Sequence, residues 1–442
     1  MPIMILKQNH KRELIEIYVN KFLVKILFIL LLIPACSLSD KTSAWKNKKN
    51  INTEIVKKKS TKKLFKSNNI IKKELNPTLK IKLKKNFEKY NYDEKKTKIS
   101  KFKLSKIRNF NQIDSKIIFY KDDLIFYDGK GSIIRFNNST KRMWTINNYS
   151  KEEKKSNPLL FLAHKDAILI VADSISKFYA VNINNGNIIW SKKNASPFNS
   201  EIKIYDNKFF IIDYENILHC YSLKTGEKIW SYKTENVLIK SQKKLSIKIK
   251  NDIIYFNNSI GDITALDVKQ GKLIWQLPTQ NNNIYAQSFS LKGSDLTFDK
   301  KSIYFSNNNN EFFSIDSSNG NINWQQKINS SIQPILYDNI IVSTSNEGLL
   351  IFMDKITGKL IRITDTFKVF KEKKKSQIHV EGFVIGNNKI YLTTSNGRLL
   401  IIDIKTGKNE KIIKIDGDKI SKPFINNNML FIVRNKAIIR FN

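Results

Sequence analysis

Short apolar runs separated by polar turns recur along most of the chain. Residues 206–223 read DNKFFIIDYENILHCYSL, and residues 387–404 read NNKIYLTTSNGRLLIIDI. Each run is four to seven residues long, too short for a helix, and is rich in Ile, Phe and Tyr. Aromatic and β-branched residues in runs of this length, broken by Asn, Asp and Gly, favour strands joined by turns. The pattern therefore predicts an all-β structure.

A second pattern follows each pair of runs. It is a turn containing glycine, and four residues after that glycine comes a tryptophan, as in TGEKIWS at 225–231. Thr140 takes the glycine position in an earlier copy, and Arg362 and Lys411 take the tryptophan position in the last two. The seven copies are spaced 38–49 residues apart. The glycines are Gly186, Gly226, Gly271, Gly320, Gly358 and Gly407, and the tryptophans are Trp144, Trp190, Trp230, Trp275 and Trp324.

A period near 44 residues with four strands in each unit is typical of a β-propeller. The glycine can take a positive φ without steric penalty, so the turn closes a hairpin. We expect the strand after it to be the outermost of its blade. The large indole on that strand would dock against the neighbouring blade.

The two ends of the chain set the predicted number of blades. After the seventh copy, residues 421–442 contain the first strands of another unit and then stop. Residues 101–113, just before the first full unit, are the candidate donor of the missing strand. Closing the ring in this way removes two exposed sheet edges. We predict eight four-stranded antiparallel blades, the last closed by an N-terminal strand, with seven blades as the alternative.

The N-terminus has the features of an export signal. Basic residues precede an apolar stretch at 22–35, which ends at Cys36 and has the length of a signal-peptide core. Residues 33–36, Ile-Pro-Ala-Cys, resemble a bacterial lipobox, in which the cysteine is lipidated; the alternative is an uncleaved anchor. Residues 1–35 are predicted to be a signal peptide ending at the lipobox. By resemblance, Ser37 after the cysteine directs such a lipoprotein to the outer membrane.

The charge of the chain is high and uneven. Lys and Arg outnumber Asp and Glu by 77 to 39, and residues 41–110 hold 24 basic and 5 acidic residues. That block has no sustained apolar period, so 36–100 is predicted to be a lysine-rich flexible tether before a propeller at 101–442. AT-rich coding also produces this excess of Lys, Asn and Ile. The sequence has no nucleic-acid-binding signature, and no nucleic-acid partner is expected.

Residues with catalytic or metal-binding potential are few. With Cys36 lipidated, Cys220 has no cysteine partner and is expected to be a small buried side chain. His164, His219 and His379 are scattered without metal-ligand spacing. We expect no cofactor, no metal and no enzymatic activity.

The repeats resemble the PQQ-type β-propeller family over about residues 110–442. In that family the same ring serves quinoprotein dehydrogenases and non-enzymatic scaffolds. The dehydrogenases commonly need adjacent cysteines, a carboxylate-rich calcium site and long insertions between blades, which this sequence lacks. The lipobox, tether and eight units instead resemble the BamB family of outer-membrane assembly lipoproteins.

One local match bears on the partner. SFSLKGS at 288–294 resembles the S-L-S-L-R-G-E segment that BamB-family proteins present to the barrel insertase. The resemblance implies that Phe289, Leu291, Lys292 and Gly293 contact a BamA-like insertase, although lysine in place of arginine weakens any bidentate pairing. An ordinary strand edge is the alternative. The family's acidic D-x-D loop is reduced at 327–339 to Asp338, expected in a strand turn.

The resemblance implies a non-catalytic scaffold, lipid-anchored at the periplasmic face of the outer membrane of a Gram-negative bacterium. Its expected partners are the insertase complex and, transiently, unfolded outer-membrane proteins pairing with exposed strand edges. The alternatives from other classes are a PQQ-dependent periplasmic dehydrogenase and a propeller that binds a ligand or polysaccharide.

Overall fold

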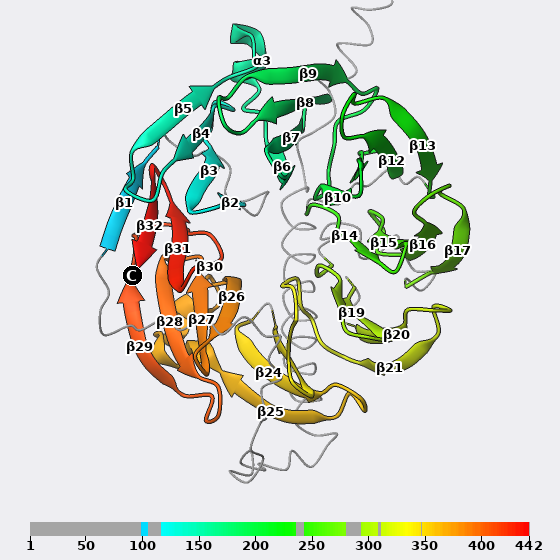
Figure 1. Cartoon of the computed structure of the whole chain (residues 1–442). Coiled ribbons are helices and arrows are strands. Elements are labelled where there is room, and N and C mark those ends of the chain that lie inside the picture. Colours follow the sequence, from blue (N-terminus) through cyan, green and yellow to red (C-terminus); the bar gives the residue numbers. More distant parts are fainter. Residues whose placement is uncertain are drawn as a thin grey trace, which may run out of the picture. The chain divides into compact units, whose positions relative to one another are not determined.

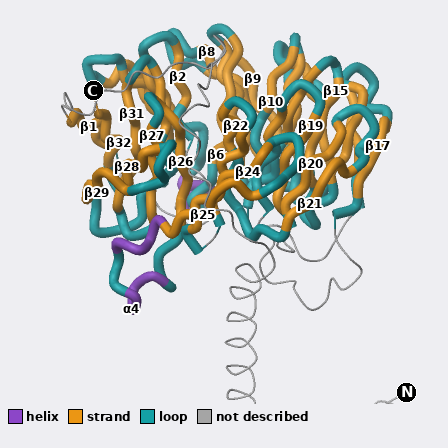
Figure 2. The backbone as a smooth tube through the Cα atoms, turned by 90° about the horizontal axis from the view of Figure 1, so that it is seen from below, coloured by secondary structure: helices purple, strands orange, loops and turns teal. Residues whose placement is uncertain are grey.

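The structure is a computed structural model that describes residues 99–104, 116–235, 243–279, 293–307, 311–345 and 347–441. These residues form eight four-stranded antiparallel sheets, arranged as the blades of a ring (Figure 1). The prediction of an eight-bladed, all-β propeller is confirmed. Described helical residues are confined to α3 (Lys151–Lys155), η3 (Thr366–Val369) and α4 (Glu372–Lys375), and Figure 2 shows α4 projecting beyond the strands.

Each of the first seven blades is a meander of four consecutive strands, from the axis outward. The strands of blades 1 to 4 are β2 (Ile118–Tyr120), β3 (Asp123–Tyr127), β4 (Ile133–Phe136) and β5 (Arg142–Ile146); β6 (Leu160–Lys165), β7 (Ile168–Asp173), β8 (Lys177–Asn182) and β9 (Ile188–Lys193); β10 (Lys203–Tyr205), β11 (Lys208–Ile212), β12 (Ile217–Ser222) and β13 (Lys228–Lys233); and β14 (Ile247–Lys250), β15 (Ile253–Asn257), β16 (Ile263–Asp267) and β17 (Leu273–Leu277).

Blades 5 to 7 repeat the arrangement, and blade 8 completes the ring. Their strands are β18 (Thr297–Phe298), β19 (Ser302–Ser306), β20 (Phe312–Asp316) and β21 (Ile322–Gln326); β22 (Ile335–Tyr337), β23 (Ile340–Thr344), β24 (Leu349–Asp354) and β25 (Leu360–Asp365); β26 (Val380–Gly386), β27 (Lys389–Thr394), β28 (Arg398–Asp403) and β29 (Asn409–Lys414); and β30 (Phe424–Asn426), β31 (Met429–Arg434), β32 (Ala437–Phe441) and β1 (Ile99–Lys103).

The N-terminal strand closes blade 8, as predicted. β1 pairs antiparallel with β32, with Phe102 opposite Ile438. β1 begins two residues before the predicted donor segment, so the boundary expected at residue 100 falls inside the strand. Phe102 is 2% exposed and packs edge-on against Phe136 of blade 1. The closing strand therefore packs with residues of blade 1 and of the C-terminal blade 8 in one hydrophobic cluster.

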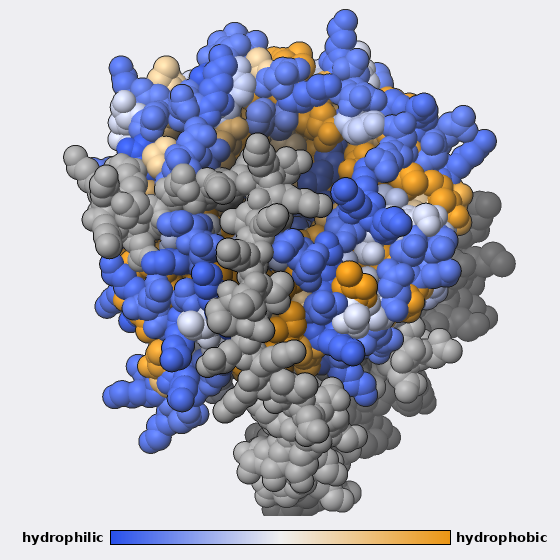
Figure 3. Space-filling view, turned by 60° about the horizontal axis from the view of Figure 1, so that its bottom comes forward, coloured by the Kyte–Doolittle hydropathy of each residue, from blue (hydrophilic) through white to orange (hydrophobic). Residues whose placement is uncertain are grey.

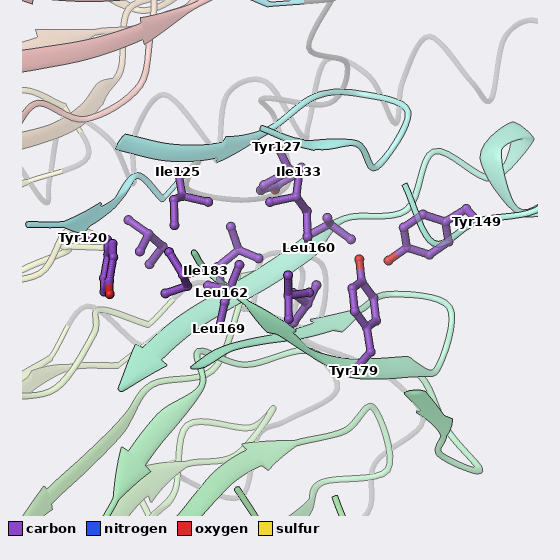
Figure 4. Packing of buried hydrophobic residues seen from close by; sticks show 13 residues of the cluster. Tyr120, Ile125, Tyr127, Ile133, Tyr149, Leu160, Leu162, Leu169, Tyr179 and Ile183 are labelled. Carbon is purple, nitrogen blue, oxygen red and sulfur yellow. The ribbon is translucent and has the colours of Figure 1, made fainter. Parts of the chain in front are cut away.

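The core consists of eight hydrophobic clusters, one at each interface between neighbouring blades. Strands in the middle of a blade, such as β11 and β12, are buried over four consecutive residues because blades cover both of their faces. Outer strands such as β9 instead alternate between exposed and partly buried residues. Figure 4 shows the cluster between blades 1 and 2, where the rings of Tyr149 and Tyr179 pack edge to face, with their centres 6.3 Å apart.

A repeated polar turn joins the two middle strands of seven blades. In each turn a side-chain oxygen accepts the backbone N–H of the residue four positions on, at 2.8–3.2 Å. Such local bonds satisfy backbone donors where the ladder ends. The residues are Asp128, Asp173, Asp213, Asn258, Asn307, Ser345 and Thr394.

Candidate functional site

Every repeat tryptophan lies against the glycine turn of the following blade. A Cβ placed on Gly226 would meet the Trp190 ring at 2.8 Å, and one on Gly271 would meet Trp230 at 2.6 Å. The indole N–H of Trp190 donates to the Leu223 carbonyl at 3.3 Å. The other four tryptophans make equivalent contacts with Gly186, Gly271, Gly320 and Gly358 and with the carbonyls of Ile183, Val268, Ser317 and Lys355.

The two copies without tryptophan behave differently. The Arg362 guanidinium lies over the Phe352 ring and donates from Nη2 to the Ile404 carbonyl at 2.6 Å, so arginine takes the place of the indole. Lys411 is exposed. The next blade offers it no equivalent hairpin, because the outer two strands of blade 8 come from opposite ends of the chain.

Three residues of the predicted partner-binding segment, Phe289, Leu291 and Lys292, lie outside the described residues, as does Cys36. Gly293 is described and lies at the axial start of blade 5. A Cβ on Gly293 would meet the Phe305 ring at 3.0 Å, and the Gly293 carbonyl accepts a hydrogen bond from Lys243 at 3.1 Å. Gly293, the described residue of the predicted segment, is therefore fixed at the axial start of blade 5.

The remaining polar candidates occupy structural positions. Asp338 lies in the turn between β22 and β23 with φ +54°, where it was expected. His219 contacts Asp213 through Nε2 at 2.8 Å, and His379 is exposed. Cys220 is fully buried, and burial raises the pKa of its thiol to about 12. Within the described ranges no three His, Cys, Asp or Glu side chains are grouped to hold a metal ion.

The outer rim of the ring combines unpaired strand edges with apolar side chains. Outer strands such as β9 and β17 each pair with one strand within the described part of the chain. They expose aliphatic side chains one or two residues before the tryptophan, or, in β29, just after Lys411 at the tryptophan position, so the rim carries an apolar stripe between polar residues. Its most exposed members are Met143, Ile188, Ile189, Ile229, Leu273, Ile274, Ile322 and Ile412.

A cluster of lysines lies at the axis, which sequence reasoning did not identify. It is built around the Glu201 carboxylate, which pairs with Lys203 at 2.9 Å and with Lys248 of the next blade at 3.1 Å. The same carboxylate accepts hydrogen bonds from Ser246 Oγ at 3.1 Å and from the Ile247 backbone N–H at 2.9 Å. We define the axial lysine cluster as Lys116, Lys203, Lys244, Lys248 and Lys422.

The charges in this cluster act strongly on one another. Burial would raise the pKa of the Glu201 carboxyl, but the neighbouring ammonium groups, Lys248 foremost, hold that pKa well below its usual range. Burial and then the charge of Lys203 lower the pKa of the Lys116 ammonium to about 7. Burial also lowers the pKa of Lys203. Among the described residues, Glu201 is thus the carboxylate that pairs with lysines of this cluster.

Lys243 belongs to a second axial network beside the first. Its ammonium group pairs with Asp295 at 3.3 Å and donates to the carbonyls of Gly293 at 3.1 Å and Ser331 at 2.7 Å. It therefore joins the axial ends of blades 5 and 6. Gly293 is the residue of the predicted partner-binding segment that the structure describes, and it takes part in this network. No helix among the described residues is long and apolar enough to span a bilayer.

Two known proteins are similar to this chain in sequence. The chain is 24% identical over 217 residues to the outer membrane protein assembly factor BamB of Legionella pneumophila (strain Paris), covering 47% of this chain and 50% of that protein. It is 20% identical over 376 residues to an uncharacterized protein of Rickettsia prowazekii (strain Madrid E), covering 79% and 88%.

Solved structures share the fold at low identity. BamB from Moraxella catarrhalis matches with a TM-score of 0.61 and 14% identity, covering 78% of this chain and all of that one. Quinohemoprotein alcohol dehydrogenase from Comamonas testosteroni matches with a TM-score of 0.60 and 10% identity, covering 80% and 77%. The family model described as outer membrane protein assembly factor BamB matches residues 129–364, more than half of the chain. The chain therefore belongs to the BamB family of outer membrane protein assembly factors.

Proposed function

We propose that the chain is a non-catalytic scaffold lipoprotein of the outer-membrane β-barrel assembly machinery. The observation that carries the proposal is the family match over residues 129–364, which lies within the eight-bladed ring. The lipid would be attached at Cys36 and would hold the ring at the periplasmic face of the outer membrane. The segment 289–293 would dock on the periplasmic part of a BamA-like insertase.

Two features of the ring support such a role. Gly293 packs against Phe305 and its carbonyl accepts a hydrogen bond from Lys243, so the last residue of the predicted docking segment is fixed at the axial end of blade 5. Apolar anchors in such a segment provide most of the energy of a protein contact. The outer strands have no second partner among the described strands and expose aliphatic residues, so they would offer unfolded barrel strands a surface for transient pairing.

A crosslinking pull-down in the native host tests the docking site. The wild type is compared with Phe289→Ala/Leu291→Ala/Lys292→Glu and with a control, Ile356→Ala/Lys359→Glu/Val369→Ala. The control removes two exposed aliphatic side chains and reverses one lysine elsewhere. We expect the insertase with the wild type and the control, and at least a tenfold loss in the first variant.

The outcomes separate the alternatives. Absence of the insertase from all three samples would remove the scaffold proposal, and bound pyrroloquinoline quinone or glycan would then be sought. Equal recovery with all three proteins would leave the scaffold in place but move the docking site away from 289–293. Each variant is first checked for a wild-type circular dichroism spectrum and thermal midpoint.

A further inference from the structure

We propose that the axial lysine cluster is a binding site for a small multivalent anion carrying phosphate or carboxylate groups. This goes beyond the proposed function, and it is tested on the purified chain without any insertase. Failure of either proposal is therefore distinguishable from failure of the other.

The first argument is convergence. Lys422 and Lys116 precede the innermost strands of blades 8 and 1, Lys203 begins that of blade 3, and Lys244 and Lys248 belong to the start of blade 4. Innermost strands line the axis of a propeller, and Figure 1 shows β2, β10 and β14 near the centre of the ring. Lysines from four blades therefore lie in the same axial region, although Lys116 and Lys422 are more than 300 residues apart in sequence.

The second argument is the balance of charge. Both oxygens of Glu201 are engaged: Oε2 by Lys203, and Oε1 by Lys248, Ser246 Oγ and the Ile247 N–H. After burial, Lys203 lowers the pKa of Lys116 most, Glu201 raises it, and Lys244 and Lys422 lower it further. Like charges in a partly buried site destabilise one another, because the low local dielectric strengthens their repulsion. A bound anion would offset this repulsion.

The third argument is Lys116 itself. Its side chain is partly buried, and its ammonium group makes no hydrogen bond or ion pair with any described residue. Burial, followed by the charge of Lys203, lowers its pKa to about 7, so the group titrates much closer to neutral pH than an ordinary lysine. An anion beside Lys116 would favour the charged form and raise this pKa. Binding would then draw a proton from solution.

The composition of the cluster defines the ligand. Its cations are lysines, which act as compact point charges, whereas arginine presents a planar fork that selects one bidentate geometry. The site should therefore distinguish ligands by their negative charge density more than by their shape. Lys422 is held in place because it lies against Gly382 of blade 7, where a Cβ would collide with the Lys422 Cβ, and its ammonium group lies 5.9 Å from the Phe424 ring centre.

Isothermal titration calorimetry with pyrophosphate and, separately, citrate tests the site in the full chain. We compare the wild type with Lys116→Gln/Lys422→Gln and with a control, Lys359→Gln/Lys373→Gln, which removes two exposed lysines. We expect saturable binding at one site by the wild type and the control, and at least tenfold weaker binding by the axial variant. Tighter binding of pyrophosphate assigns a phosphate ligand, and tighter binding of citrate a carboxylate ligand.

The pH dependence gives a readout that a non-specific charge effect would not produce. At pH 8 the wild type should take up about one proton for each anion bound, measured from titrations in buffers of different ionisation enthalpy. Affinity should fall by up to about tenfold for each pH unit above the Lys116 pKa of about 7. Lys116→Gln alone should lose the proton uptake.

Three results would overturn the proposal: no saturable binding of either anion, equal weakening in the axial and control variants, or proton uptake unchanged by Lys116→Gln. If the axial variant does not fold, the wild type alone decides by lysine acetylation and mass spectrometry. Pyrophosphate or citrate should then protect Lys116 and Lys203 at least fivefold and leave Lys359 unprotected. Equal modification with and without anion would reject the site.

Discussion

At the residue scale, the ring depends on one contact repeated between successive blades. A tryptophan covers the next glycine turn and donates to a carbonyl beside it, as Trp190 does with Gly226 and Leu223. Gly226 needs its positive φ of 68° for the turn and its missing Cβ for the close approach of the indole. Arg362 shows that a flat cation with hydrogen-bond donors serves the same purpose as an indole.

We predict that Arg362→Ala lowers the free energy of unfolding by about 1 to 3 kcal/mol, because it leaves the Ile404 carbonyl without its donor. Lys411→Ala, at the same offset in the next repeat, is the matched control. Its side chain is exposed, so we expect a change within about 0.5 kcal/mol. Urea denaturation of both variants measures the difference. Equal losses would contradict the assignment of Arg362 to blade docking.

Lys116 provides a second prediction, on the pH dependence of stability. Its pKa is about 7 in the folded protein and near 10.4 when unfolded. Below pH 7 the folded state must carry the partly buried charge, and between about pH 7 and 10 the unfolded state binds more protons. The contribution of Lys116 to the free energy of unfolding of the wild type therefore increases as the pH rises from about 7 to 10.

Lys116→Met removes this charge. We expect the variant to be more stable than the wild type by about 1 kcal/mol at pH 6, with the advantage shrinking toward pH 10. Chemical denaturation at both pH values, in buffers free of multivalent anions, measures it. A difference that does not vary with pH would show that Lys116 is not the titrating group.

At the element scale, ring closure depends on β1. Phe102 on this short strand belongs to a cluster with Phe136 of blade 1 and Phe431 of blade 8, whereas Lys101 beside it is exposed. The closure is thus made by packing as much as by the ladder with β32. Arg440 of β32 adds a hydrogen bond to the Asn138 carbonyl of blade 1 at 2.6 Å.

We predict that Phe102→Ala costs about 3 to 5 kcal/mol, the usual range for removing a buried aromatic side chain. Lys101→Ala should be near neutral. Hydrogen exchange should show faster exchange of β32 amides in the Phe102 variant, because β32 loses the support of its outer partner. Protection of β32 equal to that in wild type would mean that β1 does not hold the ring closed.

At the scale of the whole molecule, the described surface is largely polar with scattered apolar patches, as Figure 3 shows for one face. The net charge of +38 is unevenly distributed along the chain, since residues 41–110 hold 24 basic and 5 acidic residues. At the axis, five further lysines form a defined cluster because the inner strands converge there. The same geometry keeps the outer strand edges apart on the rim. Axis and rim are therefore chemically different surfaces on one scaffold.

We predict that a lipid anchors the whole molecule in the outer membrane. If the lipid is attached at Cys36, Cys36→Ser should shift the protein from the outer-membrane fraction to the soluble periplasmic fraction, by at least tenfold in their ratio. Incorporation of labelled fatty acid should be lost with it. Cys220→Ser is the matched control, because that thiol is buried in blade 3 and should not change the distribution.

The sequence predicted the repeat, the four-stranded unit, the number of blades and the N-terminal closure. Each depends on a local sequence pattern: a glycine turn, a tryptophan four residues after it, and an incomplete last repeat. The role of Arg362 did not follow, since no local pattern equates arginine with tryptophan at that offset. The axial cluster did not follow either. Lys116, Lys203, Lys244 and Lys422 look like ordinary lysines in a lysine-rich chain, and only closure of the ring brings them around one carboxylate.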